Sequence, residues 1–310
     1  MARVELHPFS DEHLDGAALL LAERHARHRT AEPLLPEITD FRQHIEREWR
    51  TDGASGAVAL EHDKAVGYLI GQRREDPVGP HVWSHLAGHA VRDAELVRDL
   101  YGVAAARWVN EGLTRHFVFV PALEDLIKPW FRLCFGASAA LAARETAPEP
   151  RVDAGVSIRL GTPADLAAAA GLERLLWLYN SRPPSFSGLE VPDLQELVDD
   201  WISTWDESLY TLFVAERDDR IVGQFVLYRR PSGDLRVLPE SIDLANAATD
   251  VELRGSGVGL TLTAHVLGWA HEHGYPTMIT DWRMTNLLAS RFWPKRGFRE
   301  TFLRLYRSIP

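Results

Sequence analysis

Residues Thr249–Leu260 read Thr-Asp-Val-Glu-Leu-Arg-Gly-Ser-Gly-Val-Gly-Leu, which places glycines at positions 255, 257 and 259. The residues just before, Ile242–Thr249, are typical of a strand. After the glycines, apolar side chains recur at helical spacing, at Leu260, Leu262, Val266, Leu267 and Ala270. The pattern predicts a glycine-rich turn between a strand and a helix. Such a turn lets a ligand approach the backbone, and the helix N-terminus favours an anion, so we expect a pyrophosphate there.

Two other phosphate-binding motifs do not fit this turn. A dinucleotide fingerprint needs its glycines at the start of a βαβ unit, whereas here they follow a predicted hairpin, Phe213–Val226. A P-loop needs Gly-Lys followed by Ser or Thr, which is absent. Taken alone, the motif also remains compatible with a turn that binds no ligand.

The residues downstream make the pattern specific. A predicted strand, Thr277–Trp282, is followed by Asn286 and Ala289, by aromatic residues ending in Gly297-Phe298, and by a final strand, Glu300–Arg307. In this order the sequence resembles the GNAT acyltransferase superfamily. The family pattern Arg/Gln-x-x-Gly-x-Gly/Ala is matched by Arg254, Gly257 and Gly259, and its Asn-x-x-Ala is matched by Asn286 and Ala289. The resemblance is strong over residues 210–310 and weaker over 156–210.

The resemblance implies binding of acetyl-CoA or another acyl-CoA as co-substrate. In such proteins the strand before the glycine turn splays away from its neighbour, and the pantetheine arm pairs with the exposed backbone. It implies that Ala247, Ala248 and Thr249 lie along the pantetheine and that Asn286 is a polar contact. The pyrophosphate cradle would comprise Arg254, Gly255, Ser256, Gly257, Val258, Gly259 and Leu260.

The reaction that the resemblance implies is direct acyl transfer to an amine. A protonated amine has no lone pair, so a base must first remove a proton. Some family members place a carboxylate just before the Asn, and Asp281, five residues before Asn286, matches that position. Asp243 and Glu240, on or near the previous strand, are rival candidates. Asp281 could instead be a strand-end carboxylate that holds Arg283 or a backbone N–H.

The sequence departs from the family at the expected acid. Many members have a tyrosine seven residues after the Asn, close to the CoA sulfur, and here that position is Trp293. An indole N–H donates a hydrogen bond but delivers no proton. Tyr306, Tyr275 or a water could serve instead, or the thiolate could leave unaided because a thiol pKa lies near 8.5.

The two halves of the chain repeat each other, which predicts two copies of one fold. Val4–Leu14 resembles Val156–Leu166, and Ala57–Ile70 resembles Phe213–Val226. Later pairs follow in the same order with a smoothly growing offset. We therefore expect an α/β (α+β) protein with two tandem GNAT-like domains, each a mixed, centrally splayed β-sheet flanked by helices. The predicted domains are 1–145 and 156–310, joined by a polar, Pro-containing linker, 146–155.

The first copy lacks the glycine motif. Its counterpart runs from Arg98 to Ala104, has one glycine, and carries Asp99, whose charge would repel a pyrophosphate. We expect a degenerate domain that is either structural or closes the acceptor pocket of the second copy. Three histidines, His81, His85 and His89, fall on its predicted counterpart of strand Ile242–Thr249. Nothing in their spacing requires a metal, and we expect none.

Composition limits the class of protein. Among 310 residues, 45% are hydrophobic and 25% are charged, which excludes a disordered chain. The one cysteine, Cys134, excludes an internal disulfide and fits a cytoplasmic protein. No signal peptide or membrane-spanning run is evident. The net charge of −10 makes a nucleic-acid partner unlikely.

These observations lead to one main hypothesis about function. We expect an acyl-CoA-dependent N-acetyltransferase that acts on an amine of a small molecule, with one active site in the second domain. A non-catalytic acyl-CoA sensor is an alternative, which Trp293 would suit. A transferase of GNAT-like fold that uses aminoacyl-tRNA is another.

Overall fold

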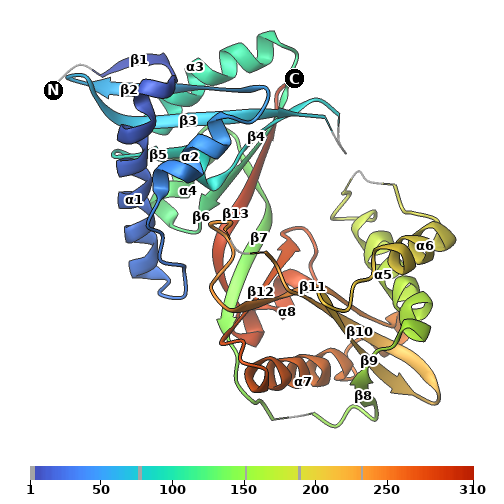
Figure 1. Ribbon diagram of the computed structural model, residues 1–310. Coiled ribbons are helices and arrows are strands. Elements are labelled where there is room, and N and C mark those ends of the chain that lie inside the picture. Colours follow the sequence, from blue (N-terminus) through green and yellow to red (C-terminus); the bar gives the residue numbers. More distant parts are fainter. Residues whose placement is uncertain (1–3, 76–78, 151, 188–189, 232) are drawn as a thin grey trace. The chain divides into compact units, whose positions relative to one another are not determined.

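The computed structural model describes residues 4–75, 79–150, 152–187, 190–231 and 233–310, and it divides into two compact units (Figure 1). Unit 1 consists of Met1–Ala140 and Glu300–Pro310, and unit 2 consists of Leu141–Arg299. The division places residues 300–310 with the N-terminal unit, whereas the sequence assigned them to the domain 156–310. Within the predicted linker 146–155, residue 151 lies outside the described residues.

Unit 1 is a mixed sheet whose strands follow the order β1-β2-β3-β4-β6-β13, with β5 paired to β3. Its parallel pair is β4 with β6. The last strand of the chain, β13 (Arg299–Ser308), runs antiparallel to β6, and Figure 1 shows the two side by side. The other elements are β1 (Glu5–Pro8), α1 (Leu14–Ala31), α2 (Phe41–Trp49), β2 (Ala54–Glu61), β3 (Lys64–Arg74), β4 (His81–Ser84), β5 (His89–Val91), α3 (Leu96–Asn110), β6 (Arg115–Pro121) and α4 (Glu124–Phe131). Strand β7 (Gly136–Glu145) crosses from unit 1 to unit 2.

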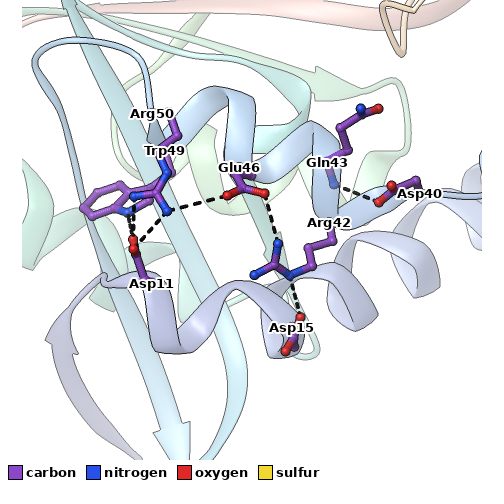
Figure 2. A network of polar contacts seen from close by, with 8 residues as sticks. All are labelled: Asp11, Asp15, Asp40, Arg42, Gln43, Glu46, Trp49 and Arg50. Carbon is purple, nitrogen blue, oxygen red and sulfur yellow. Dashed lines mark hydrogen bonds and ion pairs between the residues drawn. The ribbon is translucent and has the colours of Figure 1, made fainter.

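Polar side chains tie helix α2 to the start of α1 (Figure 2). Arg42 donates to Asp15 at 2.7 Å and to Glu46 at 2.9 Å. Asp11 accepts from the indole of Trp49 at 2.7 Å and from Arg50. These contacts are exposed, so they orient the two helices more than they stabilise the fold.

Unit 2 has the strand order β12-β11-β10-β9-β8. Helices α5 and α6 pack on one face through a cluster of Leu166, Ala169, Ala170, Leu197, Trp201, Leu212, Val214 and Val226. Helix α7 covers the opposite face, because a Cβ on Gly223 would lie 3.0 Å from Leu262 and Val258. The elements are β8 (Ser157–Leu160), α5 (Leu166–Asn180), α6 (Leu194–Thr204), β9 (Tyr210–Arg217), β10 (Arg220–Tyr228), β11 (Ser241–Thr249), α7 (Val258–Glu272), β12 (Thr277–Arg283) and α8 (Ala289–Phe292).

The sheet of unit 2 opens between β11 and β12. These parallel strands pair only from Ser241–Leu244 to Thr277–Thr280. Beyond that point β11 stays with β10 as far as Thr249, and its register skips Ala245. Such a bulge bends the strand and increases its twist. The expected central splay of the sheet is therefore confirmed, and we call its branching point the fork.

Unit 1 has a corresponding fork that its own side chains fill. Strands β4 and β6 pair over Val82–Ser84 and His116–Val118, after which a 3₁₀ turn at Leu86–Gly88 interrupts the chain. The strand expected to carry three histidines is thus broken in two. The reason is a set of bonds to the turn: Arg24 donates to the carbonyls of Leu86, at 2.8 Å, and of His89. Tyr68 donates to the carbonyl of Ala87 at 2.8 Å.

His89 itself bridges the fork of unit 1. Its Nε2 lies 2.7 Å from the carbonyl oxygen of Phe119 on β6, so Nε2 carries a proton and donates there. Burial, reinforced by the charge of Arg24, lowers the pKa of His89 to about 3. The unfolded chain takes up this proton near pH 6.5. His89 therefore contributes full stability above pH 6.5, and this contribution declines as the pH falls toward 3.

We predict that His89→Gln, which keeps a donor toward Phe119, reduces the acid sensitivity of folding. Between pH 6.5 and pH 4, the free energy of unfolding should fall with decreasing pH more steeply in the wild type than in His89→Gln. The two slopes should differ by about 1.4 kcal/mol per pH unit, the contribution of this one proton. Urea titrations at several pH values measure the slope. His7→Gln, at an exposed histidine, is the control, and an unchanged slope in His89→Gln would contradict the prediction.

Candidate active site

A cavity of about 390 Å³ lies in unit 2, where α5, β11, the glycine turn, α7 and α8 meet. Of the residues predicted to bind the co-substrate, all but Ser256 and Val258 line it. The structure brings together Ala247, Ala248, Thr249, Arg254, Gly255, Gly257, Gly259, Leu260 and Asn286. Val258 is buried beneath the turn instead, against β10. The sequence thus located a real concavity, although binding there stays a prediction.

The glycine turn presents free backbone amides. Gly255 and Gly257 have φ angles of +83° and +96°, which other residues rarely adopt. Gly257 caps α7, and the first bond into it runs from Thr261 N to Gly257 O. Within the described part of the chain, no hydrogen bond uses the amides of Gly255, Gly257, Val258, Gly259 and Leu260. A helix start of this kind is suited to bind phosphate.

The segment from Val152 to Gly155 packs behind this turn. A Cβ on Gly257 would lie 3.3 Å from Val152 and 3.5 Å from Ala154. Thr261 Oγ1 donates to the carbonyl of Val152 at 2.5 Å. Gly259 instead borders the cavity, where a Cβ would lie 3.6 Å from Phe292. The two glycines therefore differ, because a larger side chain at 257 would strike this segment whereas one at 259 would enter the cavity.

Two arginines add positive charge to the cavity. The guanidinium of Arg254 lies 5.4 Å from the centroid of the Tyr179 ring, and that of Arg296 lies 5.2 Å from the Phe292 ring. Over the residues that the structure describes, neither arginine forms an ion pair with a carboxylate. Both charges therefore remain available to an anionic ligand.

Asn286 has its polar atoms engaged within unit 2. Its Oδ1 accepts from the amides of Leu288, at 3.2 Å, and Ala289, at 3.1 Å. Its Nδ2 donates to Asn180 Oδ1 at 3.3 Å. Asn286 therefore holds the start of α8 against the end of α5 and shapes the cavity wall. The spacing of the motif located this residue but not its partner Asn180.

The two predicted catalytic carboxylates lie near the fork in different environments. Asp243 is 2% exposed, and one of its oxygens accepts from Arg230 Nε at 2.5 Å. Burial raises the pKa of Asp243 to about 6; Arg230 opposes this shift and Asp281 adds to it. The side chain of Asp281 is exposed, and among the described residues its carboxylate has no hydrogen bond or ion pair, so it does not hold Arg283. Glu240 is exposed just before β11. None of the three lines the cavity.

The structure also places the candidate acids. Trp293 lines the cavity, whereas Tyr275 and Tyr306 do not. The hydroxyl of Tyr275 accepts from Arg229 at 2.9 Å, and Tyr306 lies on β13 in unit 1. The tyrosine that lines the cavity is Tyr179, which follows Leu175 and Leu176 on one face of α5. Helical spacing on α5 could have indicated this face.

The described residues offer neither a cluster of metal ligands nor a membrane-spanning helix. No group of three or more His, Cys, Asp and Glu side chains among them could hold a metal ion. No helix in those ranges is both long and apolar enough to cross a bilayer.

Comparison with known proteins defines the class. Residues 172–298 match the model of the acetyltransferase (GNAT) family. The C-terminal part of the chain is therefore similar to this family, and the match indicates an acyltransferase that transfers groups other than aminoacyl groups. No protein in the curated set matches the sequence.

Solved structures extend the fold to nearly the whole chain. A GCN5-related N-acetyltransferase from Sphaerobacter thermophilus has a TM-score of 0.60 at 13% identity, with 98% of this chain and 95% of that chain covered. A tandem GNAT protein from the clavulanic acid biosynthesis pathway has a TM-score of 0.53 at 13% identity, with 99% and 98% covered. The expected fold of two tandem GNAT-like domains is confirmed.

We predict that Asn286→Ala lowers the free energy of unfolding by about 1 kcal/mol, because α8 loses its cap. Asn286→Asp should retain most of the stability, since a carboxylate also accepts the amides of Leu288 and Ala289. Urea denaturation of both variants measures the difference. Equal stability of the alanine and aspartate variants would show that capping is not the role of Asn286.

Proposed function

We propose that the protein is an acyl-CoA-dependent N-acetyltransferase with one active site, in unit 2. It transfers an acetyl or other small acyl group directly to an amine of a small molecule. The observation that carries the proposal is the cavity itself. Here β11, which beyond the fork is paired with β10 but no longer with β12, meets free helix amides and two arginines.

The residues present fit an acyl-CoA. The glycine turn gives unpaired N–H groups for a pyrophosphate, with Arg254 and Arg296 as neutralising charges. Past Leu244, no described strand pairs with the edge of β11 that faces β12, which suits the amide-containing pantetheine arm. Bound there, acyl-CoA supplies an activated thioester. Ala247, Ala248 and Thr249 would then orient it along the strand.

Asp281 is the base that this geometry favours, because its carboxylate is exposed and free whereas that of Asp243 is committed to Arg230. Asp281 removes a proton from the ammonium form of the acceptor, directly or through a water. The amine nitrogen forms the new C–N bond, the C–S bond breaks, and the proton passes to the departing thiolate or to water.

Unit 1 is proposed to contribute no second co-substrate site. It lacks the glycine pair, and the side chains of Arg24, Tyr68 and His89 fill its fork. We further propose a small-molecule acceptor and a cytoplasmic location. A nucleic-acid partner is disfavoured by the net charge of −10.

We predict that Gly259→Leu abolishes detectable acetyl-CoA binding. The new side chain starts 3.6 Å from Phe292 and extends into the cavity, while the helix gains propensity. Calorimetry should give one site per chain for the wild type. Gly268→Leu on the same helix, where a Cβ meets nothing within 4 Å, should bind like the wild type. A wild type that binds neither acetyl-CoA nor CoA would refute the proposed function.

We predict that Asp281→Asn lowers kcat/KM for amine acetylation by about 10²- to 10⁴-fold, the range expected for a lost general base. Its affinity for acetyl-CoA should not change. Thiol release with a panel of primary amines measures turnover, and calorimetry measures affinity. Asp219→Asn, in an exposed turn, is the matched control. Turnover within threefold of the wild type would remove Asp281 as the base, and binding without any turnover would favour the sensor.

A further inference from the structure

Asn246 lies on β11 just beyond the fork, on the same face of the sheet as the two carboxylates. The register pairs Val226 of β10 with Asn246 and Tyr228 with Asp243. Val226 and Tyr228 are two residues apart, so their partners point to one side. Ile279 pairs with Asp243, and Asp281 is two residues further along β12. A carboxamide and two carboxylates therefore share one face at the point where the strands separate.

A buried glutamine fixes the side chain of Asn246. Gln224 on β10 is fully buried, and its Nε2 donates to Asn246 Oδ1 at 2.7 Å. This bond uses the oxygen of the Asn246 carboxamide. In the described structure no hydrogen bond uses the Nδ2 of Asn246, and the side chain is half-buried. The negative charge of Asp243 and Asp281 on this face also favours an outward N–H over an outward oxygen.

The pairing of Gln224 with Asn246 is not one that stability of the fold would favour. The Oε1 of Gln224 is buried and finds no hydrogen-bond partner among the described residues, which is costly in a protein core. An apolar residue at 224 would avoid this loss, but it would leave Asn246 unrestrained. The bulge at Ala245, directly before Asn246, also redirects the strand here, as bulges beside active sites do.

We propose that Asn246 Nδ2 donates a hydrogen bond to the carbonyl oxygen of the acyl thioester, and that Gln224 is a positioning residue for it. An amide N–H is a neutral donor that suits a carbonyl oxygen and binds it more strongly as negative charge develops. This inference rests on the proposed function. It adds that the protein distinguishes a thioester from a thioether through a side chain.

The test compares two ligands by calorimetry: acetyl-CoA, and S-ethyl-CoA, a thioether that lacks the carbonyl oxygen. The wild type should bind acetyl-CoA about threefold to tenfold more tightly, as one hydrogen bond provides. Asn246→Ala should remove this preference while its affinity for S-ethyl-CoA stays within twofold. Asn246→Asp, which has the same shape but no donor at pH 7.5, should reverse the preference.

Gln224→Met tests the positioning role. The side chain keeps its length but cannot donate to Asn246, so the preference should fall at unchanged affinity for S-ethyl-CoA. Asn110→Ala is the control for Asn246→Ala, because it makes the same substitution at an exposed helix end in unit 1. It should keep the full preference for acetyl-CoA over S-ethyl-CoA.

The outcomes separate the inference from the proposed function. If the wild type binds both ligands and Asn246→Ala keeps the preference, the inference is wrong and the proposed function stands. If the wild type binds both ligands equally, the inference is also wrong. Binding of neither ligand by the wild type would overturn the proposed function itself. Asn246→Ala decides the matter even if Gln224→Met fails to fold, because Asn246 is only half-buried.

Discussion

The end of the pairing between β11 and β12, after Leu244 and Thr280, is the constraint on which the rest of unit 2 depends. Backbone groups in a sheet must find partners, and a strand that leaves its neighbour creates an edge that something else must satisfy. Because β11 remains paired with β10 on its other side, the edge is held rigidly. The glycine turn at its end then directs the amides of α7 into the same cavity.

In unit 1 the separated strands are satisfied by side chains of the unit itself. Its fork is filled by the buried side chain of Arg24, which donates to the carbonyl of Leu86 in the interrupting turn and to that of His89 at the start of β5. Burial lowers the pKa of Arg24 to about 10. Burying a cation without a carboxylate is unfavourable, so these carbonyls are needed to hold it. The helix position that carries Arg24 corresponds in the repeat to Leu176, which lines the cavity of unit 2.

The sequence could predict those features that are encoded by residues close together in the chain. The strand expected over Ile242–Thr249 is β11, and the glycine turn follows it, because strand pattern and positive φ are encoded by neighbouring residues. Helical spacing can indicate the face of α5 that carries Tyr179, but it does not specify what this face packs against, nor that Asn180 accepts from Asn286. Likewise, nothing in its own residues indicated that β13 would pair with β6 in unit 1. Partners distant in sequence are determined by tertiary packing.

The surroundings of Asp243 and Asp281 at the fork differ, so the two carboxylates differ in how readily they can accept a proton. Asp243 lies under the sheet surface with Arg230 at 2.5 Å, so taking a proton there would break an ion pair that burial makes hard to replace. The same pair removes most of one negative charge from the fork, which leaves the exposed Asp281 as the local anion. The negative charge of that carboxylate favours a cation, whereas Arg254 and Arg296 give the cavity the opposite sign. Under the proposed function, this separation of charge would place the acceptor amine near Asp281 and the nucleotide near the two arginines.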